Sequence, residues 1–151
     1  MSDEDWGHIA SNSVKATLLE PTNDSEKLDT IVGELLKKPL SKPNGNENPK
    51  QSETTYTSFL RDPYVKAWIL QNAKGTCEAC SYIAPFERND GSPYLEVHHV
   101  HPLAEGGSDT VENTIAVCPN CHRNLHFGKY KNEIKQRIIE TTVRLINNGH
   151  S

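Results

Sequence analysis

The chain has 151 residues, enough for one domain of ordinary size, and only 34% of them are hydrophobic, a low share for a fully packed protein. The net charge of −4 excludes a uniformly basic surface, and no apolar run approaches the roughly 20 residues that a membrane span needs. The polar, acidic N-terminus lacks the pattern of a secretory signal, so we expect a cytoplasmic protein without membrane contact.

The acidic charge lies in residues 1–57, which hold ten Asp and Glu against six Lys, whereas residues 58–151 hold ten of each sign. A helix is predicted over about residues 25–38, with Asp24 or Ser25 as N-cap, because one helical face carries Leu28, Ile31, Val32, Leu35 and Leu36. The Pro-, Asn- and Ser-rich stretch that follows predicts a flexible linker. We therefore expect a polar segment over 1–57 and a folded domain over 58–151.

Within the folded part, Asp62 and Pro63 predict a helix start and Gly75 its end, with Trp68 on the side that faces the core. Strands are predicted at 94–98 and 114–117. A helix after Pro119 follows. A last helix is expected where apolar residues recur at helical spacing, and residues 147–149 are expected to close it. The recurring residues are Ile134, Ile138, Ile139, Val143 and Ile146.

Four cysteines occur as two Cys-x-x-Cys pairs, Cys77/Cys80 and Cys118/Cys121. Two intervening residues allow both thiolates of a pair to turn onto one tetrahedral Zn²⁺. A redox pair usually comprises one such motif beside a βαβ pattern, which is not visible here. The spacing therefore predicts a structural zinc site, with 37 residues between the two pairs.

Several histidines lie between residues 98 and 126. His98 and His99 are adjacent on a predicted strand, so they point to opposite faces and can serve different roles. His122 and His126 are four residues apart and share one face of a helix. Three imidazole ligands, from the strand end and the helix, leave positions on a metal open for water and phosphate. His101 is expected to be a loop or strand-end residue.

The segment LEVHHVHPLAEGGSDTVENTIAVCPNCHRNLH resembles the motif of HNH (ββα-metal) endonucleases, especially the zinc-containing McrA-like restriction endonucleases. The flanking pieces AWILQNAKGTCEAC and APFERNDGSPY are also similar to that group. The resemblance covers roughly residues 58–128. It implies an α+β fold, with a ββα-metal core, a four-cysteine zinc site and flanking helices. The implied reaction is metal-dependent hydrolysis of DNA phosphodiesters, in restriction or another defence role.

Position by position, the resemblance implies that His99 is the general base and that Asn113 holds the loop and orients that base. His122 matches the final letter of the motif, a metal ligand. His98 stands where the family has Asp or His as a ligand, and His126 matches the third ligand of all-histidine sites. Three imidazoles suit Mn²⁺, Ni²⁺, Co²⁺ or Zn²⁺ better than Mg²⁺, so the activating metal stays open.

Other residues are expected to support this site. Glu96 lies two residues before His98, on the same strand face, and is expected to orient a histidine. Arg123, Lys129 and Lys131 belong to the basic C-terminal stretch and are expected to contact DNA phosphates.

The alternative function is a non-catalytic zinc module that binds DNA, against which the set of His99, Asn113 and His122 argues. Four questions stay open. They are the DNA sequence or modification recognised, whether a homodimer forms, the role of residues 1–57, and whether the chain is complete or a C-terminal fragment.

Overall fold

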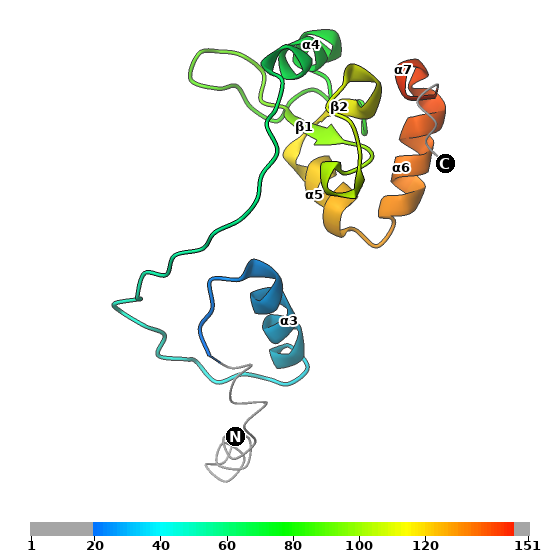
Figure 1. The fold of residues 1–151 in the computed structure, drawn as a ribbon. Coiled ribbons are helices and arrows are strands. Elements are labelled where there is room, and N and C mark those ends of the chain that lie inside the picture. The colour runs from blue at the N-terminus through cyan, green and yellow to red at the C-terminus, as the bar shows by residue number, and fades with distance from the viewer. Residues whose placement is uncertain (1–19, 147–151) are drawn as a thin grey trace. The chain divides into compact units, whose positions relative to one another are not determined.

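The computed structural model describes residues 20–146, which divide into two units at Thr57 and Ser58 (Figure 1). The helices and strands of the second unit run in the order α4, β1, β2, α5, α6 and α7, with two short 3₁₀ helices between the strands, η1 (Leu103–Glu105) and η2 (Val111–Asn113). No helix in the described residues is long and apolar enough to cross a membrane.

The first unit contains helix α3 (Ser25–Leu35), with Asp24 as its N-cap. The Asp24 carboxylate accepts hydrogen bonds from the backbone N–H groups of Glu26 and Lys27, which satisfies two donors of the first turn. Ile31 is the buried residue of this helix. The predicted helix and its cap are confirmed, but the helix ends at Leu35 rather than near residue 38.

Helix α4 (Pro63–Ala73) begins as expected, with Pro63 in its first turn and the Asp62 carboxylate accepting from the Tyr64 N–H. The left-handed turn that ends it takes two residues, Lys74 and Gly75, with φ angles of 52° and 80°. The expectation that Trp68 lies in the core is wrong. Ile69 takes the inward position and is fully buried, while Trp68 is 45% exposed, with the Arg144 guanidinium 5.8 Å from its ring.

Strands β1 (Glu96–His99) and β2 (Thr114–Val117) form an antiparallel pair, in which His98 pairs with Ile115. The bounds of β2 are as predicted. Strand β1 starts two residues later than predicted because Tyr94 donates its backbone N–H to Phe86 across the preceding hairpin. All of β2 is buried, so the sheet is the centre of the core.

Helix α5 (Pro119–Phe127) follows β2 directly, with Cys118 as N-cap, and carries His122 and His126 as predicted. The helix predicted near the C-terminus is interrupted. Helix α6 (Lys131–Thr141) and helix α7 (Val143–Ile146) are separated by an extended residue at Thr142. Leu145 is therefore buried, whereas Val143 is 74% exposed. Residues 147–149, expected to close this helix, lie outside the described residues.

The core is a cluster of buried apolar side chains from α4, β2, α6, α7 and the turns between them, and partly buried side chains of β1, η2 and α5 pack against it. A partly buried ion pair joins Arg144 of α7 to Glu78 in the turn after α4, with Nη2 and Oε1 2.6 Å apart. Glu78 also accepts the Ala116 N–H, and Arg144 donates to the carbonyls of Val111 and Thr114. One arginine thus ties α7 to the end of the loop that leads into β2 and to the first cysteine pair.

We predict that Arg144→Met destabilises the second unit by about 3 kcal/mol, because it leaves the Glu78 carboxylate and two carbonyls without their charged partner. Urea unfolding of the metal-loaded chain, followed by circular dichroism, measures the loss. Gln136→Met on the exposed side of α6 is the matched control. Equal stability of the two variants would contradict the bracing role of Arg144.

Candidate metal and active site

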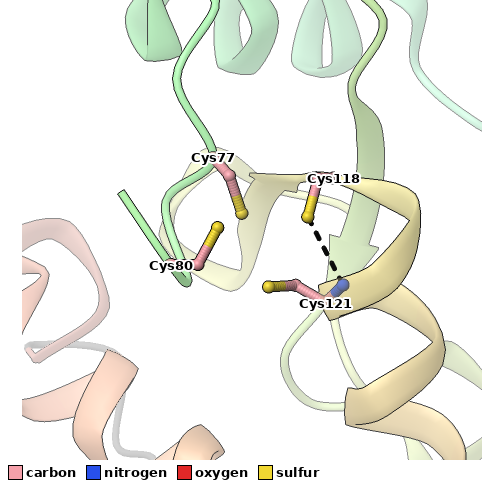
Figure 2. A group of neighbouring side chains, drawn as sticks. All are labelled: Cys77, Cys80, Cys118 and Cys121. Carbon is pink, nitrogen blue, oxygen red and sulfur yellow. Dashed lines mark hydrogen bonds between the residues drawn. The ribbon is translucent and has the colours of Figure 1, made fainter. Parts of the chain in front are cut away.

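The four cysteines meet at one point, as predicted from their spacing. Cys77 and Cys80 come from the turn after α4, and Cys118 and Cys121 from the N-terminal turn of α5 (Figure 2). All four sulfur atoms lie within 4.8 Å of one another. This is a closed set of four soft donors, which suits a tetrahedral structural metal and leaves no position for substrate.

Local backbone geometry brings each pair of thiols together. Ser81 adopts a left-handed φ of 67°, and its N–H donates to the Cys77 carbonyl, which curls the first pair. The Cys121 N–H points to the Cys118 sulfur at 3.5 Å (Figure 2). Burial raises the pKa of the Cys80 and Cys121 thiols, so a cation is needed to compensate for the lost solvation of their thiolates.

A second group of donors consists of His98 on β1 and His122 and His126 on α5. Their ring nitrogens lie within 4.8 Å of one another, and the two Nε2 atoms on α5 are 3.2 Å apart. Burial, followed by the charges of nearby histidines, lowers the pKa of His98 to about 3. Burial also lowers the pKa of His126. Neutral imidazoles are the form that binds metal, and the exposed position of His126 leaves the group open on one side.

Glu96 holds one ring of this group. Its Oε1 lies 2.8 Å from Nδ1 of His122, and its Oε2 accepts the Tyr94 hydroxyl at 2.7 Å. These hydrogen bonds, first that of Tyr94 and then that of His122, lower the pKa of Glu96. The contact leaves Nε2 of His122 for the metal group. Tyr94 was not anticipated as a site residue, because its place in the sequence predicted only a strand position.

His99 is the next residue on β1 after His98, and Glu96, the partner of His122, borders the same groove as His99. The Nε2 of His99 is 2.8 Å from Oδ1 of Asp109, and both residues line this groove of about 360 Å³ between α4 and β1. The groove is also lined by Arg61, Lys66 and Arg88. Asp109 was not predicted as a site residue, because an aspartate in a Gly- and Ser-containing loop is typical of any turn.

Asn113 is fully buried and holds the loop between the strands. Its side-chain amide donates to the carbonyls of His101 and Ser108, at 3.0 and 2.7 Å, and its oxygen accepts the His101 N–H at 2.9 Å. The side chain that contacts the His99 ring is Asp109 and not Asn113. The His101 residue is exposed in the loop.

The three cationic residues expected to contact DNA are exposed on or after α5. The Arg123 guanidinium lies 5.9 Å from the centroid of the Phe127 ring. The Lys129 ammonium is 5.4 Å from the centroid of the Tyr130 ring. The Lys131 ammonium lies 3.5 Å from the His126 carbonyl, which places a positive charge near the histidine group.

The sequence that carries these side chains is similar to known proteins. Residues 77–128 match the family described as HNH endonuclease. Over 144 residues the chain is 47% identical to the Type IV methyl-directed restriction enzyme EcoKMcrA of Escherichia coli (strain K12), with 95% of this chain and 52% of that protein covered. The chain thus spans about half the length of this relative. The family match, the two-stranded sheet and the two donor groups confirm the predicted fold class.

Two further similarities are shorter. The chain is 43% identical over 37 residues to Anaredoxin of Nostoc sp., covering 24% of this chain and 49% of that protein. It is similar to the solved structure of the Type IV phosphorothioation-dependent restriction endonuclease ScoMcrA, with a TM-score of 0.49 and 35% identity over 54% of this chain and 16% of that one.

Asn113→Ala is expected to destabilise the second unit by about 3 kcal/mol, because it leaves the His101 N–H and two carbonyls without partners. Asn113→Asp should also be destabilising, since a carboxylate accepts the His101 N–H but donates to neither carbonyl. Thermal unfolding measures both, with Asn132→Ala on the exposed side of α6 as control. Wild-type stability of Asn113→Ala would show that the loop does not depend on this side chain.

Proposed function

Because residues 77–128 are an HNH endonuclease segment, we propose that the protein is a metal-dependent endonuclease that hydrolyses DNA phosphodiester bonds in restriction or defence. One observation carries the proposal. A three-histidine group with an open side includes His98, and the separate histidine His99 is the next residue of the same strand, in a groove that is also lined by Glu96, the partner of His122. The name of the relative, a methyl-directed restriction enzyme, supports the biological role.

The two donor groups have different roles in this proposal. The four thiols take a structural Zn²⁺, which stabilises the junction of β2 and α5. His98, His122 and His126 take the catalytic ion, for which Mn²⁺, Ni²⁺, Co²⁺, Zn²⁺ and Mg²⁺ are the candidates. That ion supplies Lewis-acid stabilisation for charge on the phosphate and on the departing oxygen. Glu96 keeps the His122 ring turned so that its Nε2 is available as a ligand.

His99 is the general base in this reaction. Its neutral ring takes a proton from a water molecule, whose oxygen forms a bond to phosphorus while the bond from phosphorus to O3′ breaks. The departing oxygen takes a proton from solvent, and His99 later returns its own proton to solvent. The products carry a 5′-phosphate and a 3′-hydroxyl. Asn113 supports this step by fixing the loop beside the base.

DNA is proposed to lie across both sides of β1. Arg123, Lys129 and Lys131 meet phosphates on the α5 side, where a duplex presents its charge. The groove beside His99 offers further cations from Arg61 and Lys66. Cutting both strands at once requires two active sites, so a homodimer on the DNA is part of the proposal.

The decisive test is plasmid cleavage by the purified chain with Mn²⁺, Ni²⁺ or Mg²⁺, and with EDTA as the metal-free control. His99→Ala is expected to lose about 100-fold or more in cleavage rate while it retains DNA binding, because only the proton acceptor is removed. His101→Ala, which removes an exposed ring two residues away, is the matched control and should cleave normally.

Methylated and unmethylated plasmids are compared in this assay, since the relative is named as methyl-directed. DNA binding without cleavage under every metal would favour the alternative, a non-catalytic zinc-dependent DNA-binding module. Full cleavage by His99→Ala would remove His99 from the mechanism.

Mutations should distinguish the roles of the two metal-binding groups. Cys121→Ser is expected to lose the structural Zn²⁺ and with it cooperative unfolding, because zinc affinity contributes directly to folding. His126→Ala should keep that Zn²⁺ and the fold but lose metal-activated cleavage. Metal content after dialysis and thermal unfolding measure these outcomes. Loss of the fold in His126→Ala, or normal zinc content in Cys121→Ser, would contradict the assignment.

A further inference from the structure

The Asp109 carboxylate contacts His99, which is not part of the metal group. Its Oδ1 lies 2.8 Å from Nε2 of His99, and the side chains of the pair are only 19% and 13% exposed. We propose that Asp109 is a positioning residue for His99. Its carboxylate accepts the Nε2–H of the ring and so leaves the Nδ1 lone pair to take the proton of the attacking water. This inference rests on the proposed nuclease function.

The carboxylate itself is held at both oxygens. While Oδ1 faces His99, Oδ2 accepts the backbone N–H of Asp62 at 2.7 Å. Asp62 is the N-cap of α4, so its backbone position is fixed by the start of that helix. A carboxylate fixed at both oxygens cannot rotate, and the ring that donates to it is fixed in turn.

The loop around Asp109 is held on both sides. The Ser108 carbonyl accepts the Asn113 amide at 2.7 Å, and the Thr110 carbonyl accepts the Thr114 hydroxyl at 2.6 Å. A side chain on Gly107 would overlap the His101 carbonyl oxygen, so the loop also passes too close to its own backbone there for any larger residue. The buried Asn113 therefore fixes the loop that carries Asp109, and Asp109 in turn fixes the His99 ring.

The charge of Asp109 favours one arrangement of the ring proton. Burial opposes its ionisation, but the Asp62 N–H, the His99 ring and the Arg61 charge outweigh burial and lower its pKa. An ionised carboxylate only accepts hydrogen bonds, so the ring nitrogen that faces it must be the donor. In a neutral imidazole the other nitrogen, Nδ1, then carries the lone pair.

The competing interpretation is that Asp109 only braces the loop against α4 through Asp62. A brace affects stability and DNA binding, whereas a positioning residue affects the chemical step. Asp109→Asn separates the two, because the amide has the same shape and keeps the side chain in place while it loses the charge. Glu105→Gln removes the same charge from an exposed position in the same loop and is the matched control.

Steady-state cleavage by the full chain, with the metal that supports the fastest wild-type cleavage, gives the first readout. We expect Asp109→Asn to lower kcat by at least about 10-fold with KM within about twofold of wild type, as for a base held in the wrong tautomer. Glu105→Gln should match wild type in both. An unchanged kcat, or a loss that falls wholly on KM, would overturn the proposal.

Nitrogen-15 NMR of the Zn²⁺-loaded chain with labelled histidine, at a pH where the ring is neutral, gives a readout that needs no activity. The His99 proton should reside on Nε2 in the wild type, and Asp109→Asn, whose amide oxygen stays with the Asp62 N–H and whose NH2 group then faces the ring, should shift it to Nδ1. A wild-type proton on Nδ1 would overturn the proposal. If the wild-type chain cuts no DNA, the nuclease function fails, and the NMR result still decides whether Asp109 fixes the ring.

Discussion

The arrangement of both donor groups depends on the four cysteines. The two strands have only four residues each, which is too little sheet to hold a fold alone. The cysteine cluster joins the turn after α4 to the junction between β2 and α5, so the elements that carry the histidines are fixed at that point. A metal bound by the four thiols would add its affinity to the folding free energy of this small core.

Strand β1 divides the chemistry between its two faces. Adjacent side chains on a strand point in opposite directions, so His98 faces the rings on α5 while His99 faces the groove beside α4. A shift of one residue in the pairing of β1 with β2 would exchange these two positions. The pairing of His98 with Ile115, a fully buried residue of β2, opposes such a shift. The register of a short sheet is therefore a functional constraint.

Patterns in the sequence predicted the parts of this structure that have a local or strongly spaced signal. Strand β2 and the cap of α4 are examples, and so is the meeting of the two cysteine pairs. The parts that depend on tertiary contacts were missed. Apolar spacing alone did not show the break at Thr142, because Arg144 is drawn into a buried network on one side of it. Asp109 was missed for the same reason, since its partners lie 10 and 47 residues away.

Two carboxylates make opposite selections between the nitrogens of two histidines. Glu96 occupies Nδ1 of His122 and leaves Nε2 facing the metal group, whereas Asp109 occupies Nε2 of His99 and leaves Nδ1. Without these partners each neutral imidazole would exchange between its two tautomers, and part of each population would present a proton where a lone pair is needed. In the proposed mechanism, one histidine thus becomes a metal ligand and another a base, because a carboxylate accepts the N–H of a different ring nitrogen in each.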